Sequence, residues 1–497
     1  MMKLVTQEQI KKLESDWIQQ TGQGWSLALM ERAGLALVEA SKVYNEPFLI
    51  ICGKGNNGGD GIVAARHLAS FKKKVNLCLT SDESLLSNDA KVNLELVKDK
   101  VNIVHVLKED DSSFDVALKN SNTIIDCILG TGSNNSISGL YEWLVKKIND
   151  SKKDVIACDV PTGVNPNTGE ISTVAIKAKE TITIGYVKIG LVVYPAKKYT
   201  GTIRVVDIGL PDIETNTYFL DSQFARENFP KRQEDSNKGN YGRTLVIAGS
   251  EQYPGAALLA SKAAASIGSG ITSLASKKEV FIQITPVLPE VTHVEFNINT
   301  ILEESMKSSV IVLGPGLTCS DEVKNLVEEI IKNVTIPIVL DADGINVLAG
   351  RKEILKLAKS ELIITPHPKE FARLLECNVD EILKDKISLV RKVSSELNCT
   401  ILLKGPGTIV STKGENSYIS PFANSALAKG GTGDVLAGFI GGLIAQKANP
   451  SIAACLAVYI HGKTGELIAN EKTVFSLLPQ DLIAYLPSAI KELKIVC

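Results

Sequence analysis

The sequence lacks an excess of charge of either sign, and it lacks a long apolar run. Its 497 residues include 54 lysines and arginines against 56 aspartates and glutamates, a formal net charge of −2. This balance excludes a surface built to bind polyanions, so we expect no nucleic acid partner. No uninterrupted apolar run reaches the roughly 20 residues that a membrane span needs. The best candidate, 435–445, is short and rich in glycine. We therefore expect no membrane partner.

A signal peptide and a cysteine framework are also missing. Residues 1–18 carry scattered charges where a signal peptide has an apolar core, so we expect the protein to stay in the cytoplasm. The nine cysteines are odd in number and form no Cys-x-x-Cys pair. This pattern favours neither a zinc site nor a disulfide framework, and we expect reduced, mainly buried thiols.

The sequence does contain a regular alternation of short apolar runs and longer amphipathic stretches. This pattern is typical of parallel strands with crossover helices. The expected strands are 48–52, 75–79, 123–129 and 155–160, and in a second series 244–249, 310–314, 336–341, 362–365 and 400–404. A chain of 497 residues exceeds what one core supports. A polar passage near 207–217 separates the two series, so we expect two doubly wound α/β domains, 1–215 and 216–497.

The first group of candidate residues is a glycine loop. Directly after the expected strand 48–52 comes Gly-Lys-Gly-Asn-Asn-Gly-Gly-Asp-Gly, residues 53–61, and an apolar helix pattern begins at Ile62. Glycines let a backbone close around a ligand, and the amides at a helix start favour an anion. A tight strand-to-helix turn is the plain alternative. Asn56 and Asn57 speak for a ligand, because they add amide groups that a simple turn does not need.

Two further expected strands end in carboxylates, Asp126 and Asp159. In doubly wound sheets, ligands bind beyond the carboxyl ends of the strands, so both aspartates can converge with the glycine loop. The Asn57 amide, the Asp126 carboxylate and the Thr162 hydroxyl are hard oxygen donors that could hold a hard cation. Each aspartate alone could instead be an N-cap or turn residue.

Together these stretches, from about Leu4 to Leu210, resemble the N-terminal domain of the NAD(P)H-hydrate epimerases, which carry an Asn-Asn-Gly-Gly-Asp-Gly loop and an Asp-x-Pro-Ser/Thr-Gly turn. The resemblance implies a Rossmann-like fold and a potassium ion at Asn57, Asp126 and Thr162. We choose Asp159 for acid/base work at the hydrated carbon, because a carboxylate beside the ligand can move a proton if its pKa is raised. Lys188 could assist, although we expect an exposed, solubilising lysine. The implied contacts of the hydrated nucleotide are Asn56, Asn57, Gly58, Gly59, Asp60, Gly130, Thr131, Gly132, Ser133, Asn134, Asn135, Ser136 and Asp159.

The second group of candidate residues is Asn-Ser-Ala-Leu-Ala-Lys-Gly-Gly-Thr-Gly-Asp, residues 424–434, followed by the apolar stretch 435–445. A glycine-rich turn that opens a helix gathers unpaired amides and the positive end of the helix dipole, which suits phosphate. Asp434 would compete with such an anion. It therefore makes functional sense chiefly if it faces a substrate hydroxyl or proton, and helix N-capping is the structural alternative.

The Gly-Thr-Gly-Asp segment resembles the ribokinase-like superfamily, in which this aspartate takes the proton from a hydroxyl that attacks a nucleotide phosphate. Further motifs at 242–250, 313–317, 340–344, 364–370 and 403–408 are similar, in the same order, to the NAD(P)H-hydrate dehydratases. The resemblance implies that Asp434 is catalytic. It places the hydrated substrate at Ala256, Gly316, His367 and Asp434, and the nucleotide at Lys404, Gly405, Pro406, Gly407, Thr408 and Gly433.

The two resemblances imply a bifunctional repair enzyme for NADHX and NADPHX, the hydrates of NADH and NADPH. We expect the first domain to interconvert the epimers, with potassium bound. We expect the second to dehydrate the S epimer with ADP, accompanied by Mg²⁺. ADP rather than ATP is implied because the fused layout resembles the bacterial form. Asp341 and Asp343 could lie near the phosphates or the metal, but turn roles fit them equally well.

We also expect a homo-oligomer. Two alternatives stay open: a small-alcohol kinase with a regulatory nucleotide-binding front domain, and a front domain that senses nucleotides or binds a partner without catalysis. The Pro-His-Pro and Lys-Gly-Pro-Gly-Thr segments argue against the kinase.

Overall fold

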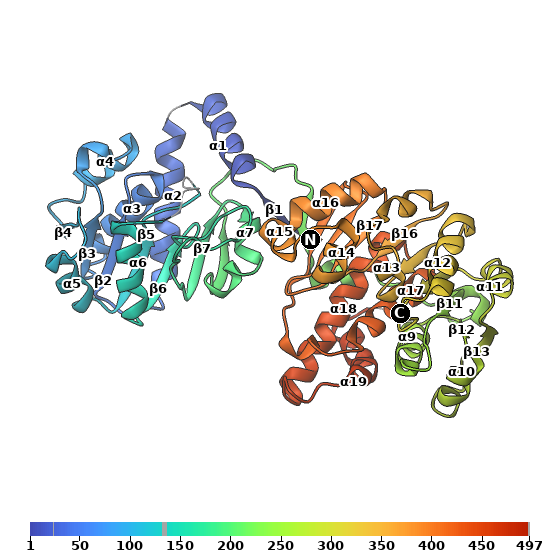
Figure 1. Ribbon diagram of the computed structural model, residues 1–497. Coiled ribbons are helices and arrows are strands. Elements are labelled where there is room, and N and C mark those ends of the chain that lie inside the picture. Colours follow the sequence, from blue (N-terminus) through green and yellow to red (C-terminus); the bar gives the residue numbers. More distant parts are fainter. Residues whose placement is uncertain (23, 132–136, 496–497) are drawn as a thin grey trace. The chain divides into compact units, whose positions relative to one another are not determined.

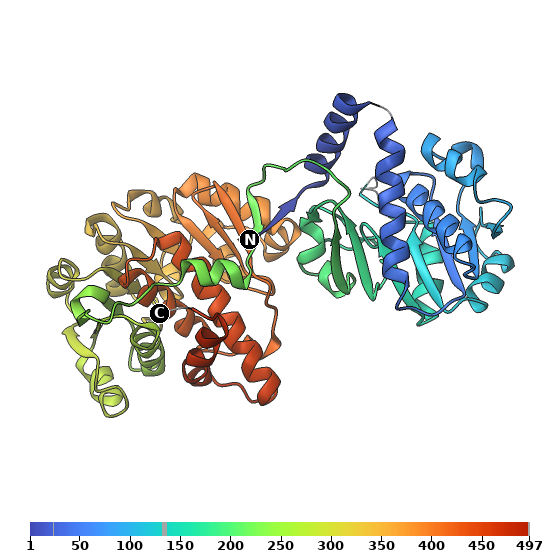
Figure 2. The same cartoon turned by 180° about the vertical axis from the view of Figure 1, so that it is seen from behind.

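The computed structural model describes residues 1–22, 24–131 and 137–495. The chain divides into two compact units, an N-terminal unit of Lys3–Thr215 and a C-terminal unit of Asn216–Cys497 with Met1–Met2 (Figure 1). Each unit is a sheet of mainly parallel strands flanked by helices, as Figures 1 and 2 show from opposite sides. The expected α/β class is confirmed for both units.

The N-terminal unit is built around a parallel sheet. Its elements are β1 Met2–Val5, α1 Gln7–Thr21, α2 Gly24–Ser41, β2 Phe48–Cys52, α3 Asn56–Ser70, β3 Val75–Leu79, α4 Asn88–Glu95, β4 Asn102–His105, α5 Ser112–Lys119, β5 Thr123–Cys127, α6 Leu140–Asp150, β6 Asp154–Cys158, β7 Glu180–Ile184, β8 Val187–Lys188, α7 Ile189–Val192 and β9 Thr202–Val206. The strand order is β4-β3-β2-β5-β6-β7-β9. The order reverses between β2 and β5, so a ligand crevice is expected at the carboxyl ends of these two strands.

Strand β2 shows why this sheet reads as continuous apolar runs. Phe48, Ile50 and Cys52 pack with helices α2 and α3, while Leu49 and Ile51 belong to the core beneath α5 and α6. Because successive side chains point to opposite faces, a strand covered on both sides needs apolar residues at every position.

The C-terminal unit repeats this plan with a longer sheet. Its elements are β10 Thr217–Phe219, α8 Ser222–Asn228, β11 Arg243–Ile247, α9 Pro254–Ile267, β12 Ile271–Ser276, α10 Lys278–Ile284, β13 Thr292–Glu295, α11 Ile298–Ser305, β14 Val310–Leu313, α12 Asp321–Asn333, β15 Ile338–Leu340, α13 Asp343–Asn346, β16 Leu362–Ile364, α14 Pro368–Leu375, α15 Val379–Lys384, α16 Lys386–Leu397, β17 Thr400–Leu403, β18 Ile409–Thr412, β19 Asn416–Ile419, α17 Thr432–Ala445, α18 Pro450–Glu471, α19 Pro479–Ala484 and α20 Leu486–Glu492. The strand order is β13-β12-β11-β14-β15-β16-β17-β18-β19-β10. The strands from β13 to β17 are parallel, and the order reverses between β11 and β14.

Helix α17 explains the apolar, glycine-rich stretch after Asp434. A Cβ added at Gly438 would lie 2.3 Å from the Ala260 carbonyl oxygen, and one at Gly442 would lie 2.2 Å from the Ile267 side chain. These glycines therefore let α17 pack closely against α9. Helix α18 is long and apolar enough to cross a membrane by length and composition alone, with a mean hydropathy of 1.2. In the fold, 67% of that stretch is buried, within the same core as α17.

Cysteine burial follows the expectation from the sequence. Among the described residues, Cys52, Cys78, Cys127, Cys158, Cys399 and Cys455 are buried free thiols, whereas Cys319 is exposed and Cys377 is partly buried.

Candidate functional sites

Helix α3 begins six residues earlier than the sequence analysis expected, at Asn56 instead of Ile62. The reason is close packing. A Cβ at Gly53 would lie 1.9 Å from the Ile128 carbonyl oxygen, and one at Gly58 would lie 1.9 Å from the Gly53 carbonyl oxygen. These two glycines thus let the strand-to-helix turn fit against the sheet. Gly55, the N-cap, has open space at its Cα and lines a cavity.

This cavity has a volume of about 830 Å³ and lies at the crevice between β2 and β5. The expected contact residues Asn56, Asn57, Asp60, Gly130, Thr131 and Asp159 all line it. Gly58 and Gly59 do not line the cavity, and both are buried. The expected contacts Gly132, Ser133, Asn134, Asn135 and Ser136 lie outside the described residues. A cavity of this size beside helix amides can hold a nucleotide-sized ligand.

The three expected cation ligands lie at the same crevice. The Asp126 carboxylate is fully buried and accepts hydrogen bonds from Thr162 N at 2.8 Å, Thr162 Oγ1 at 2.7 Å and Ile128 N at 3.2 Å. Burial raises the pKa of Asp126 to about 6, although these hydrogen bonds oppose the shift. Both polar atoms of the Asn57 amide are buried without a partner among the described residues. This set of hard oxygens fits an alkali cation.

Lys188 is the clearest correction to the sequence analysis, because only 1% of it is exposed. Its Nζ donates to the Ile184 carbonyl at 2.7 Å, to Thr183 Oγ1 at 3.3 Å and to Asp159 Oδ1. Asp159 Oδ1 also accepts from Ile184 N at 3.2 Å. Lys188 therefore fixes the orientation of the Asp159 carboxylate at the cavity wall, and it is no solubilising side chain.

Helix α1 contributes a wall that the sequence analysis missed. Gln7, Lys11, Glu14 and Ile18 line the cavity, and their spacing places them on one helix face. Burial, followed by the neighbouring Asp159, raises the pKa of Glu14 to about 6. Burial also raises the pKa of Asp60 well above its usual range, and Asp159 and Glu14 add to that shift. In the sequence, the spacing i, i+4, i+7 and i+11 of these four residues indicates a shared helix face, and this was the signal that could have identified the wall.

The second site begins at helix α17, where Gly431 is the N-cap with φ of +95°. Asp434 lies in the first turn and is not the N-cap, and the N-cap glycine makes no side-chain hydrogen bond to the helix start. Burial raises the pKa of Asp434 to about 7, and Asp341 adds to the shift while Lys404 opposes it. Such a carboxyl group is poised to accept a proton near neutral pH.

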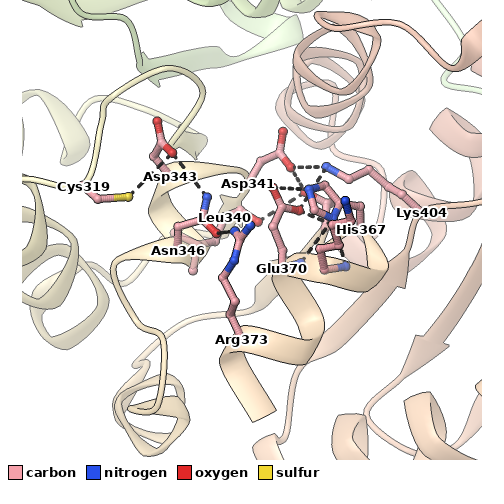
Figure 3. Close-up of polar contacts among 11 residues, drawn as sticks. Cys319, Leu340, Asp341, Asp343, Asn346, His367, Glu370, Arg373 and Lys404 are labelled. Atoms are coloured by element: carbon pink, nitrogen blue, oxygen red, sulfur yellow. Dashed lines mark hydrogen bonds and ion pairs between the residues drawn. The ribbon is translucent and has the colours of Figure 1, made fainter. Parts of the chain in front are cut away.

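Asp341, for which the sequence allows either a ligand-binding or a turn role, is central to this site. Its Oδ1 accepts hydrogen bonds from Lys404 Nζ at 2.7 Å and from Thr365 Oγ1 at 2.7 Å. Its Oδ2 is buried without a partner among the described residues. Figure 3 shows Asp341 facing Lys404, with Glu370 beside them; Lys404 Nζ lies 3.7 Å from Glu370 Oε2. Burial disfavours the charge of Lys404, but the Asp341 and Glu370 carboxylates raise its pKa overall.

His367 forms the N-cap of helix α14. Its Nδ1 accepts hydrogen bonds from Lys369 N at 3.1 Å and Glu370 N at 3.2 Å. Its own amide donates to Glu370 Oε2 at 2.7 Å (Figure 3). Burial lowers the pKa of His367, and the Glu370 carboxylate only partly offsets this. The His367 Nδ1 therefore has a structural task as the cap of α14, while its Nε2 lies 3.4 Å from Glu370 Oε1.

Asp343, which follows strand β15, bonds to the loop after β14 and to its own helix, α13. It accepts from Thr318 N at 2.8 Å and from Asn346 Nδ2 at 3.3 Å, and Asn346 in turn accepts from Arg373 at 2.6 Å (Figure 3). These contacts give Asp343 the turn role that was one of its two alternatives.

The remaining expected residues lie at the carboxyl ends of the strands. A Cβ at Gly316 would lie 2.8 Å from Ala256 Cβ, so the first turn of α9 meets the loop after β14 at the point where the strand order reverses. A Cβ at Gly433 would lie 3.4 Å from Lys404 Nζ, which brings the start of α17 to the end of β17. The β17–β18 turn contains Gly405 and Gly407 at positive φ, and Thr408 Oγ1 donates to the Gly405 carbonyl at 3.0 Å.

Comparisons with known proteins match both units. A family model described as NAD(P)H-hydrate dehydratase matches residues 244–488, and one described as YjeF-related protein N-terminus matches residues 26–190. The bifunctional NAD(P)H-hydrate repair enzyme of Moorella thermoacetica is 34% identical over 94% of this chain and 93% of its own. The Escherichia coli enzyme of the same description is 30% identical over 92% of this chain and 88% of its own.

A solved structure resembles the C-terminal unit. The ADP/ATP-dependent NAD(P)H-hydrate dehydratase of Bacillus subtilis, co-crystallised with ATP and Mg²⁺, aligns with a TM-score of 0.51 and 33% identity. The alignment covers 56% of this chain and all of that one. The relatives match along nearly their whole length and in both units, so the chain belongs to the family of bifunctional NAD(P)H-hydrate repair enzymes.

Proposed function

We propose that the N-terminal unit interconverts the R and S epimers of hydrated NADH and NADPH, and that the C-terminal unit returns the S epimer to NADH or NADPH while ADP is converted to AMP and phosphate. The observation that carries the second activity is Asp434, a carboxyl group with a pKa of about 7 at the glycine-rich start of a helix, beside Lys404 and Asp341. Joining the units is useful because they share one substrate.

The chemistry of the hydrate explains why a kinase-like site is suitable. An enamine protonates at the carbon β to nitrogen, so addition of water leaves the hydroxyl on the ring carbon bonded to nitrogen. Hydroxide is a poor leaving group, whereas phosphate is a far better one. Phosphorylation of the hydroxyl, followed by elimination, therefore restores the ring double bond.

In the proposed dehydration, Asp434 takes the hydroxyl proton while that oxygen attacks the β-phosphorus of ADP, and the bond to AMP breaks. The ring nitrogen then donates its electron pair as the C–O bond to phosphate breaks. Loss of a proton from the adjacent carbon completes the double bond. The amides at the start of α17 and the Lys404 ammonium stabilise the negative charge of the phosphate.

The nucleotide is assigned to Lys404, Gly405, Pro406, Gly407, Thr408 and Gly433, and the hydrate to Ala256, Gly316, His367 and Asp434. Support comes from the short separation between Gly433 and Lys404 and from the open backbone at Gly405. Mg²⁺ bound with the nucleotide would neutralise phosphate charge. Asp341 suits it, because Asp341 Oδ2 is a buried acceptor without a partner among the described residues.

For the epimerase reaction, the hydrate is assigned to the cavity in front of Asp159, with Asn56, Asn57, Asp60 and Thr131 among its walls. Potassium would be held by Asn57, Asp126 and Thr162, where it would stabilise the ligand-binding turn and balance negative charge. Asp159, fixed by Lys188, is the proposed acid/base group.

The proposal is tested by mixing the full chain with both epimers of NADHX and following the return of the reduced-nicotinamide absorbance with ADP, ATP or neither. Complete recovery with ADP is expected, because epimerisation feeds the dehydration. Recovery with ATP alone would replace ADP as the donor. No recovery under any condition would refute the dehydratase assignment. Rapid recovery of the S epimer alone, with the R epimer recovered only at the rate of spontaneous epimerisation, would refute the epimerase assignment.

A further inference from the structure

Helix α1 lies outside the residues matched by the family model, which begin at 26, yet it forms a wall of the N-terminal cavity. The helix is held firmly in place. Thr6 and Gln9 form a capping box, with Gln9 N to Thr6 Oγ1 at 3.2 Å and Thr6 N to Gln9 Oε1 at 2.9 Å. Strand β1 pairs with β8 at Val5 and Lys188, and Ile10, 1% exposed, packs with Val5. The helix is thus fixed with one face, which carries Gln7, Lys11, Glu14 and Ile18 and is called the inner face here, in the cavity wall.

Two polar side chains on this inner face have no partner within the described part of the chain. Gln7 is 3% exposed, and its Oε1 is buried without a hydrogen bond. The Glu14 carboxyl group accepts no hydrogen bond from any described residue, although it is partly buried. Burying polar groups without partners costs free energy, so groups of this kind are explained by a ligand that fills the cavity.

Asp159 and Glu14 enter the cavity from different elements. Asp159 follows β6 and accepts hydrogen bonds from Lys188 and Ile184 at Oδ1, which leaves it arranged as a proton acceptor. Glu14 comes from α1 and has no donor committed to it. The cavity therefore presents one carboxylate that is fixed by donors and one carboxyl group that is free to carry a proton.

Epimerisation at a carbon that bears both a hydroxyl and a ring nitrogen needs such a pair. If the hydroxyl leaves with assistance from nitrogen, the carbon becomes planar, and water must return from the opposite face to invert it. One group must protonate the departing oxygen, and another must take the proton of the incoming water. A single carboxylate cannot serve both faces of the ring at once.

We propose that Glu14 is the second acid/base catalyst of the epimerase site and acts on the face of the ring opposite to Asp159. This inference rests on the proposed epimerase function. In one direction, the C–O bond breaks, its electron pair and the Glu14 proton form water, and the nitrogen pair forms the C=N bond. Water then bonds to the other face, Asp159 takes its proton, and the electron pair returns to nitrogen. The opposite direction uses the same groups in exchanged roles, so atoms and charge balance.

Asp60 is the competing candidate, since it also lines the cavity. It lies deeper than Glu14, with 8% exposed, and it accepts from the Cys158 thiol at 3.9 Å. We assign it to the floor of the site. The charged groups near Glu14 are Lys11 on its own helix, Asp159 in the cavity wall with the buried Lys188 bonded to it, and Asp60.

The test uses the full chain with excess ADP, so that its own dehydratase removes the S epimer first and the later phase reports conversion of R to S. Glu14→Gln should slow that later phase by at least about 100-fold, the usual contribution of a general acid or base. The first phase should stay unchanged. Asp16→Asn is the matched control, because Asp16 is an exposed carboxylate on the same helix that does not line the cavity.

Two further readouts separate catalysis from a structural role. The epimerisation rate of the natural chain should change near pH 6, and Glu14→Gln should lose that change, whereas Glu14→Asp should keep it with partial activity. In ¹⁸O-labelled water, each epimerisation should place one labelled oxygen in the hydrate.

An unchanged later phase in Glu14→Gln, or epimerisation without label, would overturn the inference while the epimerase function stands. Loss of the later phase in Asp60→Asn alone would transfer the role to Asp60. An inactive natural chain would instead refute the proposed function itself.

Discussion

The pH dependence of dehydration should report the environment of Asp434. Burial and the nearby Asp341 carboxylate raise the pKa of Asp434 to about 7. A general base works only when ionised, so the turnover rate should rise with pH through this value and then level off. For a pKa near 7, the ionised fraction is ~0.1 at pH 6 and ~0.9 at pH 8, so the rate should increase roughly 10-fold between these pH values.

Asp341→Asn tests the role of Asp434 in a second, independent way. The substitution removes a negative charge that raises the pKa of Asp434, and it frees Lys404, which lowers that pKa. Both changes favour the ionised form of Asp434. The acid limb should therefore move down by about one pH unit or more, the usual effect of one nearby charge. Absolute turnover will also fall, because Asp341 orients Lys404, so the shape of the profile is compared and not its height.

The assay follows the absorbance of reduced nicotinamide at saturating S-NADHX, nucleotide and Mg²⁺, from pH 5 to pH 9. The Asp434→Asn variant should lose dehydration at every pH but keep epimerisation, and an unchanged denaturation midpoint of the C-terminal unit serves as the control for folding. A flat profile between pH 6 and pH 8, or an acid limb that Asp341→Asn leaves in place, would refute the role of Asp434 as a base. So would an Asp434→Asn variant with full dehydratase activity.

Three further predictions concern single residues. Gly431→Ala should destabilise the C-terminal unit by about 1–3 kcal/mol, measured by chemical denaturation, because φ is +95° and the new Cβ would lie 2.8 Å from Leu259 Cδ1; an unchanged midpoint would contradict this. His461 is buried, and burial lowers its pKa to about 4. The unfolded chain therefore takes up the proton first, and the free energy of unfolding should fall by roughly 3 kcal/mol as pH drops from about 6.5 to 4. His461→Gln should remove that loss of stability. If the free energy of unfolding of the variant keeps the same pH dependence, His461 is not its cause. Asp126→Ala should abolish the stimulation of epimerisation by KCl relative to choline chloride while dehydration continues, and a stimulation equal to that of the natural chain would argue against this potassium site.

Many of the strands could be predicted from the sequence, because buried parallel strands need apolar residues at every position. The expected strands 48–52 and 75–79 coincide with β2 and β3, and the expected strand 362–365 extends one residue beyond β16. Strands with polar or partly exposed residues, such as β4 with its pattern Asn-Ile-Val-His, were not expected. Local composition carries no strong signal where only part of a strand is covered.

Helix α3 starts earlier than its local sequence predicts. Asparagine and glycine are weak helix formers, so the apolar pattern at Ile62 was the natural place to begin the helix. The helix nevertheless starts at Asn56, because Gly53, Gly58 and Gly61 let it pack tightly against β2 and the residues that follow β5. Tertiary contact outweighed propensity there.

Local sequence patterns indicate the class of each domain, the position of Asp159 after a strand and of Asp434 at a helix start, and the resemblance to a repair family, because these depend on neighbouring residues and their periodicity. Three features depend instead on the folded chain: Lys188 is buried against Asp159, Asp341 pairs with Lys404, and Glu14 reaches the cavity from helix α1. Each of these facts joins residues far apart in the chain. The pKa and burial of a charged group depend on what the fold packs around it, and no local pattern contains that information.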